Sequence, residues 1–237
     1  IHWPTLEKMV ETAKRLKIPF VYTFHTLFTE YLHFIPLIPP KISAPIVRAL
    51  VRAFCNKLCD HVVVPTAKTK KILIEEYKVT APIEVIPTGV VAADVERATS
   101  AGIRERLDIP ANSYVLIYVG RFSKEKNIYF LLRMFEKLLT LEQKADVRLL
   151  FVARGPLMNE VKKYVQDKGL SQKIIFAGEV KREEIYNFYK AADLMVCASK
   201  TETQGLVLSE AKACGLPAVA IDAAGVSEMI DQGVDGY

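Results

Sequence analysis

Five short apolar runs from residue 115 onward each end near a glycine or a charged residue, and each is followed by a helical pattern. The runs begin at Val115, Arg148, Ile174, Leu194 and Ala218. A buried strand followed by an amphipathic helix is the repeating unit of an α/β fold with a parallel sheet. The loops after parallel strands share one edge, which is the usual place of a ligand crevice. We therefore predict a parallel sheet with helices on both faces and functional residues in those loops.

Two carboxylates, Glu202 and Glu210, lie in one segment with seven residues between them. Gly205 permits a tight turn and good helix formers follow it, so a helix is predicted to begin near Leu206. The first amides of that helix, at Leu206 and Val207, have no intrahelical acceptor and, with the helix dipole, favour a phosphate. Glu210 lies about one turn further along the same face and can accept hydrogen bonds from hydroxyls. The segment predicts a nucleotide-sugar site; the plainer alternative is that Glu210 is a solvated helix residue.

A cationic turn follows the first predicted strand. Gly120 and Arg121 end that strand, Lys126 follows in the turn, and the next strand leads into Gly155 and Pro156. Cations at the end of a parallel strand can stabilise the charge of a departing diphosphate. No Asp-x-Asp metal motif occurs in the sequence. We therefore expect the cations to stabilise the negative charge of the diphosphate, and we expect neither a metal ion nor another cofactor.

Taken in order, these segments resemble the retaining glycosyltransferases of the GT-B architecture, in the large family marked by two glutamates with seven residues between them. The matching segments are 86–90, 120–127, the Gly155-Pro156 loop, the element from Glu202 to Glu210, and Gly225 with Glu228. They cover almost the whole chain. One departure is Ala153, where family members usually carry a glycine, so that a side chain stands near the expected donor.

The resemblance implies two Rossmann-like domains. We expect a partial acceptor-side domain over residues 1–88, a linker over 89–104, and a nucleotide-sugar-binding domain over 105–237 that is nearly complete and truncated at its end. Family members open with a further βαβ block and close with helices that return across the first domain. The chain thus resembles a fragment, and the fragment alone is expected to be inactive.

The resemblance also assigns roles. Glu210 would hold the ribose hydroxyls and Glu202 the sugar hydroxyls, while His25, at the end of a strand predicted over 20–25, would face the donor sugar. The implied catalytic residues are His25, Arg121, Lys126 and Glu202. The implied donor-binding residues are Gly120, Arg121, Lys126, Gly155, Pro156, Glu202, Gly205, Leu206, Val207 and Glu210. Retention would follow from acceptor attack on the face that the diphosphate leaves, without a protein nucleophile.

The sequence therefore predicts a hexosyltransferase whose donor is a nucleotide sugar, with UDP-glucose favoured. The segment from His25 to Tyr31 is similar to diacylglycerol glucosyltransferases, which points to a membrane lipid as acceptor and to the inner face of the membrane. Two alternatives stay open. One is a non-catalytic nucleotide-sugar-binding module on the same sheet, and the other is a nucleotide-sugar epimerase of the same architecture.

The net charge of +5 is concentrated in the N-terminal part of the chain. Residues 1–98 carry 13 Lys and Arg against 9 Asp and Glu, a net charge of +4. The segment 42–58 has an amphipathic helical pattern with basic residues, which fits either a helix lying on anionic lipid or a core helix with a solvated basic face. Nucleic acid is the least favoured partner because no RNA- or DNA-binding motif occurs.

The cysteines and the hydropathy of the sequence indicate the cellular compartment in which the protein is expected. Cys55 and Cys59 lie one helical turn apart near His61, but no second pair of metal ligands follows, so buried thiols are expected and zinc is not. No apolar run reaches about 18 residues, and no signal-peptide pattern opens the sequence. We expect reduced cysteines and a cytoplasmic protein.

Overall fold

The computed structural model describes residues 3–34, 38–142, 144–223 and 225–237. The chain forms two compact units. Residues up to Thr88 and the short segment Glu202–Gln204 form the first, and residues 89–201 and 205–237 form the second. The segment 89–104, expected to be a linker, belongs to the second unit, where Val95 and Ile103 are buried in the core. Apolar side chains in this segment therefore fold back onto the second sheet.

Three parallel strands form the sheet of the first unit, in the order β1-β2-β3. The strands are β1 (Val21–Thr23), β2 (His61–Val64) and β3 (Ile83–Val85). The helical elements are α1 (Trp3–Leu16), the 3-10 helix η1 (Phe28–Phe34), α2 (Pro40–Leu58) and α3 (Ala67–Glu75). The predicted strand over 20–25 is shortened to β1, so His25 lies in the loop that follows, with its side chain exposed.

Five parallel strands form the sheet of the second unit, in the order β6-β5-β4-β7-β8. The strands are β4 (Tyr114–Arg121), β5 (Val147–Arg154), β6 (Ile174–Phe176), β7 (Leu194–Cys197) and β8 (Ala218–Ala220). All five predicted strands are present, and the prediction of an α/β fold with parallel sheets is confirmed. The strand order reverses beside β4, which is the topological switch point of such a sheet.

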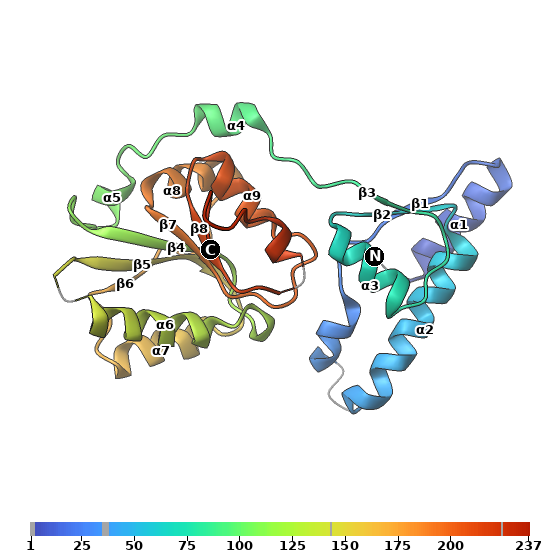
Figure 1. Cartoon of the computed structure of the whole chain (residues 1–237), viewed down its shortest axis with the longest axis horizontal. Helices are drawn as coiled ribbons and strands as arrows, with labels where there is room; N and C mark the ends of the chain where they lie inside the picture. The colour runs from blue at the N-terminus through green and yellow to red at the C-terminus, as the bar shows by residue number, and fades with distance from the viewer. Residues whose placement is uncertain (1–2, 35–37, 143, 224) are drawn as a thin grey trace. The chain divides into compact units, whose positions relative to one another are not determined.

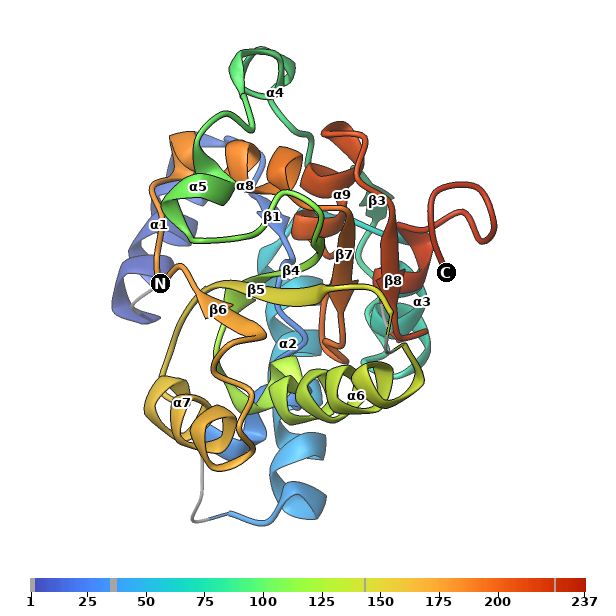
Figure 2. The same ribbon diagram turned by 90° about the vertical axis from the view of Figure 1, so that its left-hand side faces the viewer.

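Helices cover both faces of this second sheet (Figures 1 and 2). Alternate residues of β4 point to opposite sides: Val115 and Ile117 join one core cluster, and Leu116 and Tyr118 join the other. The first cluster lies under α8 (Ile185–Ala191) and α9 (Leu206–Ala213), and the second under α6 (Ile128–Leu141) and α7 (Met158–Asp167). Burial on both faces explains why the strands read as unbroken apolar runs.

The remaining elements of the second unit are short. They are α4 (Ala92–Arg97), α5 (Ile103–Arg106), and the 3-10 helices η2 (Lys124–Lys126), η3 (Arg182–Glu184) and η4 (Val226–Glu228). Within the part of the chain that the structure describes, no helix is both long and apolar enough to cross a membrane.

A polar cluster around Asp146 ties together the amino-terminal ends of β4, β5 and β6. Lys173 Nζ lies 2.5 Å from the carboxylate and Arg148 Nε 2.9 Å from it, and the hydroxyl of Ser113 donates a further hydrogen bond. These donors hold the pKa of Asp146 well below its usual range, Lys173 contributing most. The cluster stabilises the edge of the sheet opposite to the strand ends that carry the candidate site.

Candidate functional site

A cavity of about 610 Å³ opens at the carboxyl ends of β4 and β5. Its walls come from the ends of these two strands and from the segment between β6 and α8. The lining residues are Val119, Gly120, Arg121, Val152, Ala153, Arg154, Gly155, Glu179, Val180 and Ile185. This volume suits a small molecule, and the carboxyl edge beside a switch point is where open α/β sheets bind ligands.

The two arginines of the cavity differ in their surroundings. Arg154 Nη1 lies 2.7 Å from Glu179 Oε2, and this carboxylate raises the pKa of Arg154. Arg121 has an exposed side chain and makes no ion pair with any of the described residues. Because Arg121 keeps its charge uncompensated, it is the group in this cavity best placed to bind an anion.

Close packing accounts for the glycine at position 155. A Cβ atom there would lie 2.3 Å from the carbonyl oxygen of Phe122. Hydrogen bonds also join the loop after β4 to the loop after β5, from Phe122 N to Arg154 O at 2.9 Å and from Leu157 N to Phe122 O at 3.2 Å. Gly155 therefore lets the loop after β5 lie against the backbone that carries Arg121 into the cavity.

Helix α9 begins as the sequence predicts. Gly205 adopts a left-handed conformation with φ of 81°, which favours glycine, and Leu206 and Val207 open the first turn. The free amide groups of such a turn are donors for an anion. The first part of the prediction for this segment, a glycine turn followed by a helix near residue 206, is confirmed.

Glu210 is buried, with 3% of its surface exposed, so the interpretation as a solvated helix residue is wrong. Its Oε2 accepts a 3.0 Å hydrogen bond from the hydroxyl of Tyr189. Its Oε1 lies 3.1 Å from Nη2 of Arg182 but has no aligned hydrogen bond among the described residues. Burial first and the charge of Glu210 second raise the pKa of Tyr189, so the phenol stays a donor. A buried carboxylate oxygen with spare accepting capacity suits a hydroxyl ligand.

The cavity brings together only part of the predicted set. Gly120, Arg121 and Gly155 line it. The other predicted residues of the second unit, which do not line it, are Lys126, Pro156, Gly205, Leu206, Val207 and Glu210. Lys126 is half-buried in η2. Arg182, the ion-pair partner of Glu210, lies between Val180 and Ile185 of the cavity wall, so the wall and Glu210 are linked through η3.

Glu202 and His25 belong to the first unit. There the hydroxyl of Thr203 donates to the backbone carbonyl of His25 at 3.0 Å, and the hydroxyl of Thr66 donates to the carbonyl of Thr203 at 2.7 Å. Gln204 exchanges two hydrogen bonds with the backbone of Thr88, at 3.0 and 2.9 Å. These contacts fix the backbone at the carbonyl of His25 and next to Glu202.

Three residues of the site were not predicted from the sequence: Glu179, Arg182 and Tyr189. Each acts through a partner more than twenty residues away, namely Arg154 for Glu179 and Glu210 for the other two. No local pattern marks such pairs, because they form only when the loops meet. Among the described residues, no group of three or more His, Cys, Asp or Glu side chains is arranged to hold a metal ion.

Comparison with known proteins identifies the family. Residues 100–237 match the family described as Glycosyl transferases group 1, and residues 1–94 match the one described as Glycosyltransferase Family 4. The chain belongs to the group 1 glycosyltransferases. The family predicted from the resemblance is thereby confirmed, including its GT-B architecture.

Two curated relatives carry the same name, alpha-monoglucosyldiacylglycerol synthase. The one from Streptococcus pneumoniae is 36% identical over 216 residues, which are 88% of this chain and 47% of the relative. The one from Acholeplasma laidlawii is 29% identical over 215 residues, which are 87% of this chain and 53% of the relative. The chain thus spans about half the length of these curated relatives.

Solved structures show the same fold at lower identity. Anabaena Alr3699/HepE, crystallised in complex with UDP, has a TM-score of 0.76 and 20% identity, covering 96% of this chain and 60% of that one. Sucrose-phosphate synthase from Thermosynechococcus elongatus has a TM-score of 0.78 and 22% identity, covering 96% of this chain and 57% of that one. At these identities the likeness supports the fold alone.

Proposed function

We propose that this protein is a retaining glycosyltransferase that moves a hexose, with glucose favoured, from a nucleotide sugar to a diacylglycerol lipid. The observation that carries the proposal is Arg121. It is a cation without an ion-pair partner among the described residues, and it lines a cavity of about 610 Å³ in a chain of the group 1 glycosyltransferases. A diphosphate is the part of a nucleotide sugar that such a cation would bind.

The donor would be held by groups of complementary chemistry. Arg121, Lys126 and the first amides of α9 would bind the diphosphate, and Glu210 would accept hydrogen bonds from the ribose hydroxyls. Glu202 would hold the sugar hydroxyls, with His25 near the sugar. UDP-glucose is the preferred donor in this proposal because a solved protein of the same fold, Anabaena Alr3699/HepE, was crystallised with UDP-glucose.

The reaction would break the bond between the anomeric carbon and the diphosphate oxygen and form a new bond to the acceptor oxygen on the same face of the sugar. The departing diphosphate oxygen would take the acceptor proton, so that no protein nucleophile is needed. Arg121 and Lys126 would match the developing charge, and each such preorganised donor typically contributes a few kcal/mol. We propose that these cations let the reaction proceed without a metal ion.

The identity proposed for the acceptor is inferred from the names of the relatives. Two of them are named alpha-monoglucosyldiacylglycerol synthase, which supports a diacylglycerol acceptor here. An enzyme that glycosylates such a lipid must reach a bilayer, so we propose that it works at the cytoplasmic face of the membrane and contacts anionic lipid peripherally.

The test is glucose transfer by the protein in the full length that the cell makes. UDP-glucose and diacylglycerol in mixed micelles should give a glucolipid whose anomeric linkage, read by NMR, is α, and EDTA should leave the rate unchanged. Arg121→Ala should lower the rate by about a hundredfold. Arg133→Ala, on the exposed side of α6, is the matched control and should leave it unchanged.

Wild-type transfer by the Arg121→Ala variant would contradict the proposed role of the cation. The two alternatives give different products from the same assay. A non-catalytic binding module would bind UDP-glucose in calorimetry and release no glucose, with or without acceptor. An epimerase would convert the donor sugar to its epimer in the absence of acceptor.

A further inference from the structure

The cavity at the carboxyl ends of β4 and β5 has an apolar floor and a charged rim. On the floor, Val119 of β4 pairs in register with Val152 of β5, and both belong with Ile185 of α8 to one apolar cluster. On the rim, Arg121 of β4 pairs in register with Arg154 of β5. Because side chains two residues apart on a strand point to the same face of a sheet, the rim continues the face of the floor. A ligand here therefore meets aliphatic side chains first and guanidinium groups at the strand ends.

An ion pair holds Arg154 away from Arg121. Arg154 Nη1 donates a 2.7 Å hydrogen bond to Oε2 of Glu179, which follows β6. Since β5 lies between β4 and β6, this bond keeps the guanidinium of Arg154 on the β6 side of the cavity. Both side chains are largely exposed, at 77% and 64%, and an exposed ion pair contributes little to stability. The pair is therefore better explained by a ligand than by the fold.

The two ends of the cavity differ in charge. At the β4 end, Arg121 is a cation without an ion-pair partner among the described residues. At the β6 end, the charges of Arg154 and Glu179 cancel. These two side chains make no other hydrogen bond within the part of the chain that the structure describes, so Nη2 of Arg154 can donate and Oε1 of Glu179 can accept. A nucleoside diphosphate has the matching parts, an anionic diphosphate and a neutral, flat base that carries donors and acceptors.

The residue proposed to bind the ribose is linked to the segment that carries the ion pair. Arg182 of η3 comes three residues after Glu179, and its Nη2 lies 3.1 Å from Oε1 of Glu210. In a nucleotide the ribose joins the base to the diphosphate, so a ribose bound by Glu210 would place the base near this segment. The position of the ion pair therefore fits the base of a nucleotide.

We propose that Arg154 and Glu179 read the edge of the nucleobase and set the base selectivity of the donor site. The inference rests on the proposed function, because it takes the ligand of this cavity to be a nucleotide sugar. Arg154 would donate to a ring carbonyl of uracil, and Glu179 would accept from the adjacent ring N–H. Cytosine presents the reverse order, a ring nitrogen that accepts beside an amino group that donates. Because the two side chains come from different strand ends and hold each other, the pair favours uracil over cytosine.

A different role for Arg154 would be a second contact to the diphosphate beside Arg121. That role requires Arg154 to leave Glu179 and to share one anion with its register partner. The carboxylate of Glu179 would then face the same anion without its cation, and like charges repel. We therefore favour the base as the ligand of the pair. Pyrophosphate, which has no base, distinguishes the two roles.

The test is calorimetry of the full-length protein with UDP, CDP and inorganic pyrophosphate. The wild type should bind UDP at least about tenfold more tightly than CDP, since the reversed base edge leaves polar groups without partners. Glu179→Gln presents an amide that both donates and accepts, so its affinities for the two nucleotides should agree within about threefold. Arg154→Met should lose about fivefold or more in affinity for UDP and should bind pyrophosphate like the wild type.

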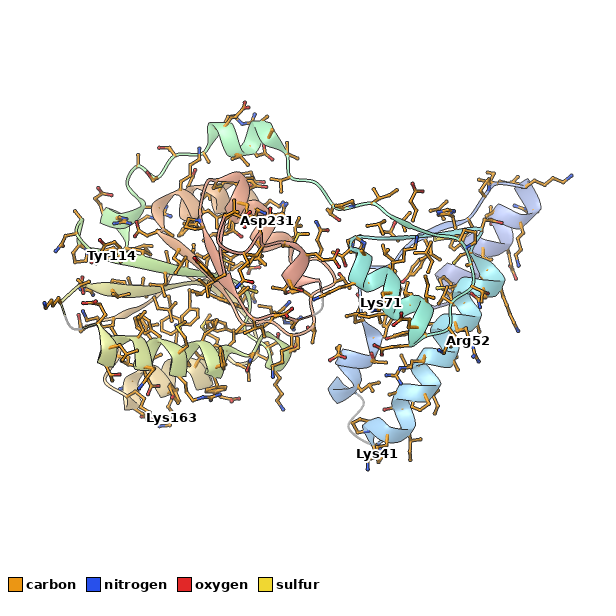
Figure 3. All side chains as sticks on the ribbon, viewed as in Figure 1. Lys41, Arg52, Lys71, Tyr114, Lys163 and Asp231 are labelled. Carbon is orange, nitrogen blue, oxygen red and sulfur yellow. The ribbon has the colours of Figure 1, made fainter. Side chains whose placement is uncertain are left out.

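The matched control is Asp167→Asn, which changes an exposed ion pair away from the cavity. Asp167 pairs with Lys163 at 2.8 Å, and Lys163 lies on the outer side of α7 (Figure 3), across the sheet from α8. This variant should keep the wild-type ratio of UDP to CDP affinity. Arg121→Ala should weaken the binding of all three ligands by similar factors, because each contains a diphosphate. All four replaced side chains are exposed, so each variant should fold, which thermal unfolding checks.

Three results would overturn the inference: equal affinity of the wild type for UDP and CDP, a wild-type ratio of these affinities in Glu179→Gln, or a loss of pyrophosphate affinity in Arg154→Met as large as the loss for UDP. The transfer assay separates these results from failure of the proposed function. A protein that prefers UDP over CDP but transfers no glucose would reject the proposed function and leave the base selectivity standing. Equal transfer from UDP-glucose and CDP-glucose would reject the base selectivity alone.

Discussion

The hydroxyl of Tyr189 and the carboxylate of Glu210 form a 3.0 Å hydrogen bond in the interior of the second unit. Tyr189 is fully buried and Glu210 nearly so, and they come from neighbouring helices, α8 and α9. The bond satisfies one carboxylate oxygen and thereby orients the other. Because a buried carboxylate is costly without donors, Tyr189 and the nearby guanidinium of Arg182 together stabilise the acidic side chain at this position.

Replacing Tyr189 with Phe should lower the free energy of unfolding by about 1–3 kcal/mol, because Glu210 Oε2 loses its donor while staying buried. Urea denaturation of the wild type and the variant measures the difference. Tyr164→Phe is the control: its hydroxyl bonds Glu136 in a half-exposed setting, and the loss should be smaller. Equal losses in both variants would contradict a special role for the buried pair.

Glu210 and Arg182 should respond differently when the binding of UDP-glucose is measured. If Glu210 holds the ribose, Glu210→Gln should weaken binding by about tenfold or more, since a charged acceptor is replaced by a neutral one. Arg182→Ala should change the Kd by less than about threefold, because the side chain of Arg182 is 67% exposed and its ion pair is screened by water. Calorimetry distinguishes the two, and a loss of affinity in Arg182→Ala as large as in Glu210→Gln would assign the anion site to Arg182.

Residues whose role is local could be predicted from the sequence. The strand ending at Arg121 and the turn at Gly205 before α9 were both predicted, because apolar runs and glycine punctuation act within a few residues. The burial of Glu210 could not be predicted, since its partner Tyr189 lies on another helix.

Replacing Gly155 with Ala should have two effects: it should destabilise the second unit, and it should disturb the cavity that Gly155 lines. The added Cβ would lie 2.3 Å from the carbonyl oxygen of Phe122, closer than atoms can approach, so the loop after β5 must move. We expect a loss of about 1–3 kcal/mol in the free energy of unfolding. Gly89→Ala is the matched control, because an added Cβ there meets nothing within 4 Å and the backbone is not left-handed. If both variants unfold like the wild type, the close approach at Gly155 is not a constraint in solution.

Asp146 makes the stability of the second unit depend on pH. Its pKa is lowered in the folded state by Lys173, Ser113 and Arg148, so the carboxylate stabilises the fold above its unfolded pKa of about 3.9, and that contribution is lost as pH falls through the lower folded value. Asp146→Asn should therefore cost about 1–3 kcal/mol at neutral pH, and the difference from the wild type should narrow only below about pH 4. Urea denaturation at a series of pH values measures this difference. Asp167→Asn, whose partner Lys163 is exposed on the same helix, should cost at most about 0.5 kcal/mol at any pH. If the difference in unfolding free energy between the wild type and Asp146→Asn already disappears between pH 7 and pH 5, these three donors do not hold the Asp146 carboxylate in its ionised form.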